Sequence, residues 1–196
     1  MITINVSSDI DRLAANLRRD VFPQLPFATA KALTDTAKDV QRTVTREIDA
    51  VFDRPIPFTR KAIGITYANK RTLTSKVFIK DIQAAYLDLE IIGGTRTPKG
   101  RALVLPVDQP TNQYGNLPRG KVKALLARAD TFSGRVRGIP GIWQRTRKGL
   151  KLLIAYRPRA SYRKRFPFYE IAARQVQLSL PRNFQAALAQ AVRSAR

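Results

Sequence analysis

Ten arginines and lysines stand close together in the last third of the sequence, and their side chains can bind phosphate. They are Arg135, Arg137, Arg145, Arg147, Lys148, Arg157, Arg159, Arg163, Lys164 and Arg165. An arginine guanidinium is a planar fork of donors that matches a phosphate or a carboxylate. The chemistry to expect is therefore electrostatic binding of a polyanion, either a nucleic-acid backbone or an acidic protein surface.

Five aromatic side chains are interleaved with these basic residues. They are Tyr156, Tyr162, Phe166, Phe168 and Tyr169. Aromatic rings beside arginines can stack on bases, but the same rings can anchor a strand and a loop in a hydrophobic core. No RNP pattern or helix-turn-helix signature accompanies them. The pattern leaves both roles open and favours phosphate contact without sequence specificity.

Catalytic and metal-binding residue types are scarce. The chain has no His and no Cys, which excludes zinc fingers, thiol nucleophiles, Ser-His-Asp triads and redox disulfides. The main acidic cluster is Asp35, Asp39, Glu47 and Asp49. Asp35 and Asp39 are spaced to share a helix face and could hold a metal ion, but one face offers no second set of ligands. We interpret the cluster as a solvated face and expect no enzyme, metal or cofactor.

The net charge of +22 over 196 residues is concentrated after residue 90. Residues 1–90 carry +3 and residues 91–196 carry +19, while eight of the ten glycines lie between Gly93 and Gly141. We expect one structural domain built from three segments. These are N-terminal helices and first strands in 1–93, a basic Gly/Pro-rich loop excursion in 94–141, and a basic hairpin with a C-terminal helix in 142–196.

The N-terminal segment has the apolar period of helices. A first helix is expected after the capping residues Ser7–Asp9 and should stop before Pro23. A longer helix should begin near Pro26, carry an apolar stripe from Ala30 to Val51, and end before Pro55. Threonines weaken its helix propensity, so packing must hold it in place.

The rest of the chain favours short strands and a final helix. Strands are expected within residues 62–79, at 103–105 and at 150–155, with a hairpin turn at 146–149. Residues 86–92 read as a strand or a short helix, and 170–179 as a helix or a strand. The last helix should follow Pro181. The sum is an α+β fold in which helices flank a small, mostly antiparallel sheet with long basic loops.

Targeting and membrane segments are not expected. The first twenty residues contain three aspartates and no apolar core, which argues against a signal peptide. No run approaches the roughly 18 to 20 apolar residues of a membrane span. We expect a protein made and kept in soluble form.

The excursion 94–141 has little regular pattern beyond 103–105 and 122–129. Such a long irregular segment is uncommon inside a compact lone domain. It either folds fully only among partner subunits or forms a disordered arm that aids solubility.

The order of several segments resembles a known family. They are Phe27–Ala37, Phe58–Ile63, Val77–Asp81, Gly93–Arg96, Ile139–Gln144, the turn at Lys148-Gly149, Tyr162–Phe168 and Leu180–Leu188. In this order they resemble the minor tail protein Z family, the tail-completion proteins of long-tailed bacteriophages. The loop between Gly94 and Lys121 is longer than in that pattern.

The resemblance implies a structural virion protein, made in the host cytoplasm and built into the tail or neck of the particle. It implies a homo-oligomeric ring at the head-proximal end of the tail, in contact with neighbouring tail and connector proteins. It assigns no catalytic residues. The alternatives are a free sequence-independent DNA-binding protein and a tail-assembly chaperone that is absent from the virion.

In such a ring the +19 half of each chain would repeat around the axis. If that half faces the channel, it would hold packaged double-stranded DNA through phosphates without reading sequence. If it faces outward or sideways, it would dock on acidic neighbouring proteins. Charge does not choose between these two orientations.

Overall fold

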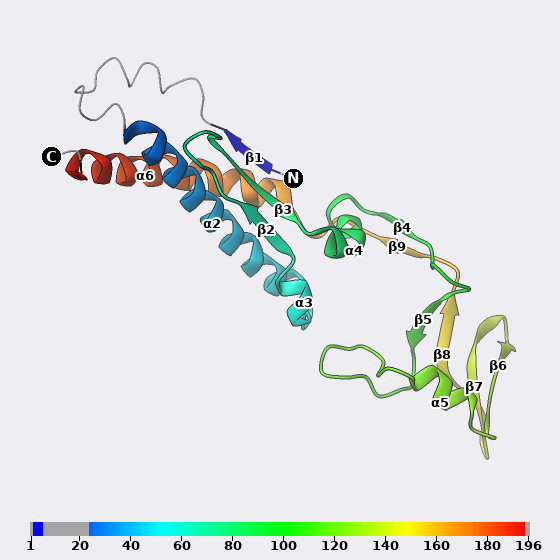
Figure 1. Ribbon diagram of the computed structural model, residues 1–196. Coiled ribbons are helices and arrows are strands. Elements are labelled where there is room, and N and C mark those ends of the chain that lie inside the picture. Colours follow the sequence, from blue (N-terminus) through cyan, green and yellow to red (C-terminus); the bar gives the residue numbers. More distant parts are fainter. Residues whose placement is uncertain (1, 6–23, 195–196) are drawn as a thin grey trace. The chain divides into compact units, whose positions relative to one another are not determined.

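The structure is a computed structural model that describes residues 2–5 and 24–194. The chain divides into two compact units (Figure 1). Unit 1 comprises Met1–Leu87 and Arg165–Arg196, and unit 2 comprises Asp88–Lys164. A long N-terminal helix, small antiparallel sheets and a C-terminal helix confirm the expected α+β class. The first expected helix, after Ser7–Asp9, lies outside the described residues.

Helix α2, Leu25–Val51, confirms the long helix predicted from the apolar stripe. Its stripe is buried from Ala30 to Ile48, and only Val51 at the end is partly exposed. Burial of one face thus compensates for the threonines of low helix propensity. The helix ends where Phe52 turns to extended backbone and Arg54 takes a left-handed φ of 46°.

Helix α6, Phe168–Ser194, packs antiparallel on α2. Near one end four alanines of the two helices form a cluster: Ala28, Ala32, Ala187 and Ala191. Such small side chains allow the two backbones to approach closely. Toward the other end the Thr43 hydroxyl donates to the Gln175 side chain over 3.0 Å.

The prediction that the last helix follows Pro181 is wrong, because Pro181 lies inside α6. The ambiguous segment 170–179 is helical and continuous with the rest. A proline interrupts one intrahelical hydrogen bond, but α6 contacts α2 both before and after it, through Gln175 and through Ala187. Tertiary packing therefore overrides the local preference.

Asp39 links α2 and α6 through a polar cluster. The Asn183 side chain donates to its carboxylate over 2.9 Å, Arg182 lies 3.5 Å away, and Arg42 forms an ion pair with it. Desolvation acts to raise the pKa of Asp39, but the hydrogen bonds from Asn183 and Arg42 and the charges of Arg42 and Arg182 outweigh it. The pKa is therefore lowered, and the ionised form stabilises the helix pair.

Replacing Asp39 with asparagine is expected to destabilise unit 1 by about 1 to 2 kcal/mol at neutral pH. Because the folded pKa lies below the unfolded value of about 3.9, the difference should be full above that value and vanish as the pH falls through the folded pKa. Urea unfolding followed by far-UV circular dichroism measures it. The control is Asp53→Asn, whose side chain is 80% exposed beside Arg54; equal midpoints for the two variants would contradict the role of Asp39.

The strands of unit 1 and its four-residue helix contact α2. Strand β3, Thr74–Ile79, pairs antiparallel with β1, Ile2–Asn5, on one side and with β2, Ile63–Thr66, on the other. The short helix α3, Pro57–Arg60, precedes β2, and α4, Asp81–Ile92, follows β3. The strands predicted within 62–79 are confirmed, and the open choice for 86–92 resolves to a helix.

Unit 2 contains two antiparallel sheets. Strand β4, Gly94–Arg96, pairs with β9, Ala160–Tyr162. The larger sheet has the order β5-β8-β7-β6. Its strands are β5, Leu103–Pro106; β6, Thr131–Val136; β7, Ile139–Thr146; and β8, Gly149–Arg157.

One face of the larger sheet carries the core of unit 2. Helix α5, Lys121–Leu126, places Leu125 in a buried cluster with Ile142, Leu153 and Ile154. The strands at 103–105 and 150–155 and the hairpin turn at 146–149 are confirmed. The excursion 94–141 is more regular than expected, since it contains β4, β5, α5, β6 and the start of β7.

The boundaries of the units differ from the expected three-part division. Residues 142–164 belong with the preceding segment because β8 pairs with both β5 and β7, whereas residues 165–196 belong with the N-terminal helix.

Among the helices that the structure describes, none combines the length and apolar character that a bilayer crossing requires.

Candidate nucleic-acid interface

Positive charge is enriched in unit 2. This unit has 17 Lys and Arg against four Asp and Glu, whereas unit 1 has 19 against ten. Nine of the ten basic residues singled out from the sequence lie in unit 2. The exception is Arg165, whose guanidinium lies 4.9 Å from the centre of the Phe52 ring in unit 1. The candidate polyanion surface is therefore a property of unit 2.

Strand pairing separates the nine residues into groups. Arg135, Arg137, Arg157 and Arg159 gather at the end of the larger sheet where β6 turns into β7 and β8 finishes. We call this the arginine end. Arg145, Arg147 and Lys148 lie at the opposite end, on the turn from β7 to β8, which we call the hairpin tip. Arg163 and Lys164 follow β9.

The hairpin tip is held in a defined shape. Thr146 pairs with Gly149 across a two-residue turn, and the Thr146 hydroxyl donates to the Gly149 carbonyl over 2.7 Å. The Arg145 guanidinium lies 4.5 Å from the centre of the Phe132 ring, a cation–π contact that leaves its charge in place. Arg147 and Lys148 are exposed at the turn. The tip therefore presents three cations on a firm protrusion.

An acidic residue beside the hairpin tip, Asp130, has its own partners, and its backbone carbonyl accepts the Arg145 N–H over 2.7 Å. The Asp130 carboxylate accepts hydrogen bonds from Arg128 over 2.6 and 2.9 Å and from Gln144 over 2.8 Å. The hydrogen bonds from Arg128 and then Gln144 lower the pKa of Asp130 to about 2. Arg128 already neutralises the charge of the Asp130 carboxylate. The positive charges of the hairpin tip therefore remain available to attract an anion from outside the chain.

Arg137 at the arginine end sits in a strained turn. It has φ of 48° and the next residue, Gly138, has φ of 79°. A two-residue hairpin turn with two positive φ values favours Asn-Gly or Asp-Gly, and a left-handed arginine costs free energy. An arginine at this position favours a role for its charge outside the turn.

The aromatic side chains that are interleaved with the basic residues have different roles in the structure. Phe166 and Phe168 are buried in unit 1, and Phe166 meets Phe52 edge to face with ring centres 5.8 Å apart. The base-stacking interpretation is wrong for these two rings, because the core encloses them. Tyr156 is half-buried and packs against the core cluster of unit 2.

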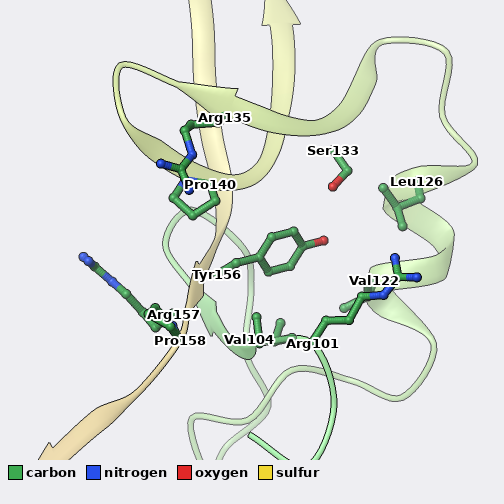
Figure 2. A pocket seen from close by; sticks show the side chains of 11 residues that line it. Arg101, Val104, Val122, Leu126, Ser133, Arg135, Pro140, Tyr156, Arg157 and Pro158 are labelled. Carbon is green, nitrogen blue, oxygen red and sulfur yellow. The ribbon is translucent and has the colours of Figure 1, made fainter. Parts of the chain in front are cut away.

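A groove of about 670 Å³ opens at the arginine end, over the face that α5 covers (Figure 2). We call it the arginine-rimmed groove. Its lining residues are Arg101, Ala102, Val104, Val122, Leu126, Ser133, Arg135, Pro140, Tyr156, Arg157 and Pro158. Figure 2 shows the Tyr156 ring in the middle, with Arg135 and Arg157 to one side of it and Arg101 to the other.

Sequence reasoning missed Arg101 as a member of this site. It stands in a loop that matches no phosphate-binding motif, and it comes two residues before β5. Leu103 pairs with Arg157 in the antiparallel ladder of β5 and β8. Arg101, two residues before Leu103, therefore lies at the arginine end. A signal existed in the strand predicted at 103–105, but its pairing partner was not evident from the sequence.

The acidic cluster of α2 is matched by cations. Asp35 lies 2.8 Å from Lys31 and 3.3 Å from Lys38, and Asp49 lies 2.6 Å from Arg60. Across residues 2–5 and 24–194, no group of three or more acidic, His or Cys side chains is arranged to hold a metal ion. The solvated-face interpretation fits Asp35 and Asp49, whose side chains are 35% and 48% exposed. It is wrong for Asp39, which is only 14% exposed because Asn183 and Arg182 of α6 cover it.

Comparisons with the models of known protein families, with curated proteins and with solved structures gave no match. The candidate site therefore has to be interpreted from its own geometry and charge.

Proposed function

We propose that the chain is a structural virion protein, a tail-completion component at the head-proximal end of a phage tail. It assembles as a ring of identical subunits and helps join tail to head. The segments that resemble the minor tail protein Z family support this, because they fall on successive elements from α2 through β3 and β7 to α6. The role is non-catalytic, in agreement with the absence of His and Cys.

The observation that carries the proposal is the set of unpaired cations at both ends of the larger sheet. Among the described residues these cations make no ion pair: Arg135, Arg137, Arg147, Lys148, Arg157 and Arg159. Side chains of this kind, repeated around a ring, bind polyanionic surfaces. We assign the hairpin tips to the packaged double-stranded DNA end, held through phosphates without sequence readout.

Mass spectrometry of purified particles, combined with omission of the gene, tests the assembly role. We expect the protein in the particle, and we expect filled heads and unjoined tails when the gene is omitted. Normal infectious particles without the protein would contradict the proposal. A protein that tails require but purified particles lack would instead be an assembly chaperone.

The charge of unit 2 favours one further candidate, a free sequence-independent DNA-binding protein. Such a protein would compact DNA by itself, and particles would form normally without it. The same omission experiment separates it from a tail component, because only the tail component leaves heads and tails unjoined.

A further inference from the structure

The arginine-rimmed groove differs in kind from the hairpin tip. We propose that it binds an extended acidic segment of a partner protein, one that carries an apolar side chain between carboxylates. The proposal concerns the ligand class of the groove and does not depend on the role in a phage tail.

The floor of the groove is apolar. It is formed by Val104, Val122, Leu126, Pro140, Tyr156 and Pro158. Val104 and Leu126 are more than two-fifths exposed, so a ligand can still cover them. Burial of an apolar side chain on this floor is favourable, whereas a phosphodiester would lose hydration there without gaining a partner. The single aromatic ring also offers little for a run of stacked bases.

The floor is firm enough to select a ligand. Tyr156 and Val122 both pack on the buried cluster that contains Leu125 and Ile154. Strand pairing further fixes Tyr156, which stands opposite Val104 in the ladder of β5 and β8. Preformed concave sites of a few hundred Å³ are typical of ligand pockets, and the volume of about 670 Å³ suits a few side chains.

The rim selects for negative charge. Arg101, Arg135 and Arg157 line the groove, no acidic residue does, and none of the three is ion-paired within the described part of the chain. Each reaches the groove from a different strand or its flank, so positive charge lies on both sides of the apolar floor. Figure 2 shows Arg101 on one side of the Tyr156 ring and Arg135 and Arg157 on the other, with the Arg157 guanidinium pointing away from the ring. A guanidinium binds a carboxylate through two parallel hydrogen bonds. A peptide with an apolar side chain between carboxylates would contact the apolar floor and the arginine rim at the same time.

Peptide binding to the full-length protein tests the proposal. The probe is a fluorescein-labelled peptide, GDELFDEG, whose anisotropy is measured beside two controls, GDESSDEG without apolar side chains and GNQLFNQG without charges. The double variant Arg135→Ala with Arg157→Ala should weaken binding of GDELFDEG about tenfold or more. The matched variant Arg147→Ala with Lys148→Ala removes the same charge at the hairpin tip and should leave peptide affinity nearly unchanged.

A second pair of variants tests the floor. Leu126→Ser should weaken GDELFDEG binding and leave the weak binding of GDESSDEG unchanged. Leu150→Ser, at a comparably exposed leucine outside the groove, should change neither. Because both leucines are half exposed, neither variant removes buried core.

Three results would overturn the proposal. The first is no binding of GDELFDEG, or equal binding of GDESSDEG. The second is an equal loss of peptide affinity in the two charge variants, which would show attraction by net charge alone. The third is a larger loss of affinity for single-stranded dT20 in the groove variant than in the tip variant. That result would mean that the groove binds nucleic-acid phosphates.

Discussion

Replacing Gly141 with alanine is expected to unfold the larger sheet of unit 2 while the helices of unit 1 persist. A Cβ at this position would lie 2.1 Å from the Ile154 carbonyl oxygen and 2.9 Å from the Leu152 Cδ1. The oxygen belongs to the backbone of β8 and has no rotamer by which to move away. The β7–β8 pairing must therefore open beside its irregularity at Ile142 and Trp143. We expect a cost of about 3 kcal/mol or more, at the upper end for overpacking.

Two spectroscopic signals separate the units in this experiment. Trp143 is the only tryptophan and is buried in β7, so its emission reports on unit 2. The long helices α2 and α6 of unit 1 dominate far-UV circular dichroism. Gly141→Ala should red-shift the Trp143 emission and largely preserve the helical signal.

The control is Gly100→Ala in the same unit. Nothing lies within 4 Å of a Cβ added at Gly100, and its backbone is outside the left-handed region. This variant should keep the wild-type emission and urea midpoint. A Gly141→Ala protein that behaves like it would contradict the steric account.

The sequence predicts an element well where one feature decides its structure. The apolar stripe of α2 needs only helical period and a buried face, and it is found as predicted. The turn at 146–149 likewise follows from local residue types. The prediction that a helix begins after Pro181 was wrong. Contacts with α2, which is remote in sequence, stabilise α6 on both sides of this proline.

Strands β6 and β7 were not predicted from the sequence, because they contain residues that usually interrupt strands. Gly134, Pro140 and Gly141 all disfavour a strand by local preference. Pro140 is tolerated near the start of β7, and Gly141 is required where β8 approaches closely. The conflict with local preference is thus settled by pairing, which a single sequence does not display.

The candidate site was predicted in composition but not in arrangement. Apart from Arg101, its basic residues were singled out from the charge of the sequence. Their division into an arginine end and a hairpin tip depends on strand order, which the sequence does not show. The rings near Arg165 illustrate the same limit, because a stacking ring and a core ring are the same residue types. Phe166 is enclosed by the core while Tyr156 faces the groove.

The two ends of the larger sheet offer a polyanion different surfaces. The hairpin tip is a polar protrusion, and the groove end joins charge to an exposed apolar floor. A phosphate backbone needs only charge and access, whereas an acidic protein segment also gains from burying apolar atoms. Under the two proposals, one unit would bind DNA at one end and a protein neighbour at the other.

Removing the charges of the hairpin tip is expected to weaken duplex DNA binding by on the order of a hundredfold near 0.15 M salt. Each phosphate contact contributes about 0.9 to the slope of log affinity against log salt, so the triple variant Arg145→Ala, Arg147→Ala and Lys148→Ala should lower that slope by about 2.7. Anisotropy of labelled duplexes of unrelated sequence, between about 50 and 200 mM salt, measures it. Wild-type affinity should not depend on the DNA sequence, because the proposed contacts of the tip are to phosphates alone.

The matched control removes the same charge from the groove, through Arg101→Ala, Arg135→Ala and Arg157→Ala. If DNA meets the tip directly, this variant keeps most of the slope, because counterions are released only where phosphates are neutralised. An equal fall in both variants would mean that DNA responds to the whole field of unit 2, and a wild-type protein without salt dependence would exclude phosphate binding. Unchanged Trp143 emission in both variants ensures that any difference arises from the removed charges and not from loss of the sheet.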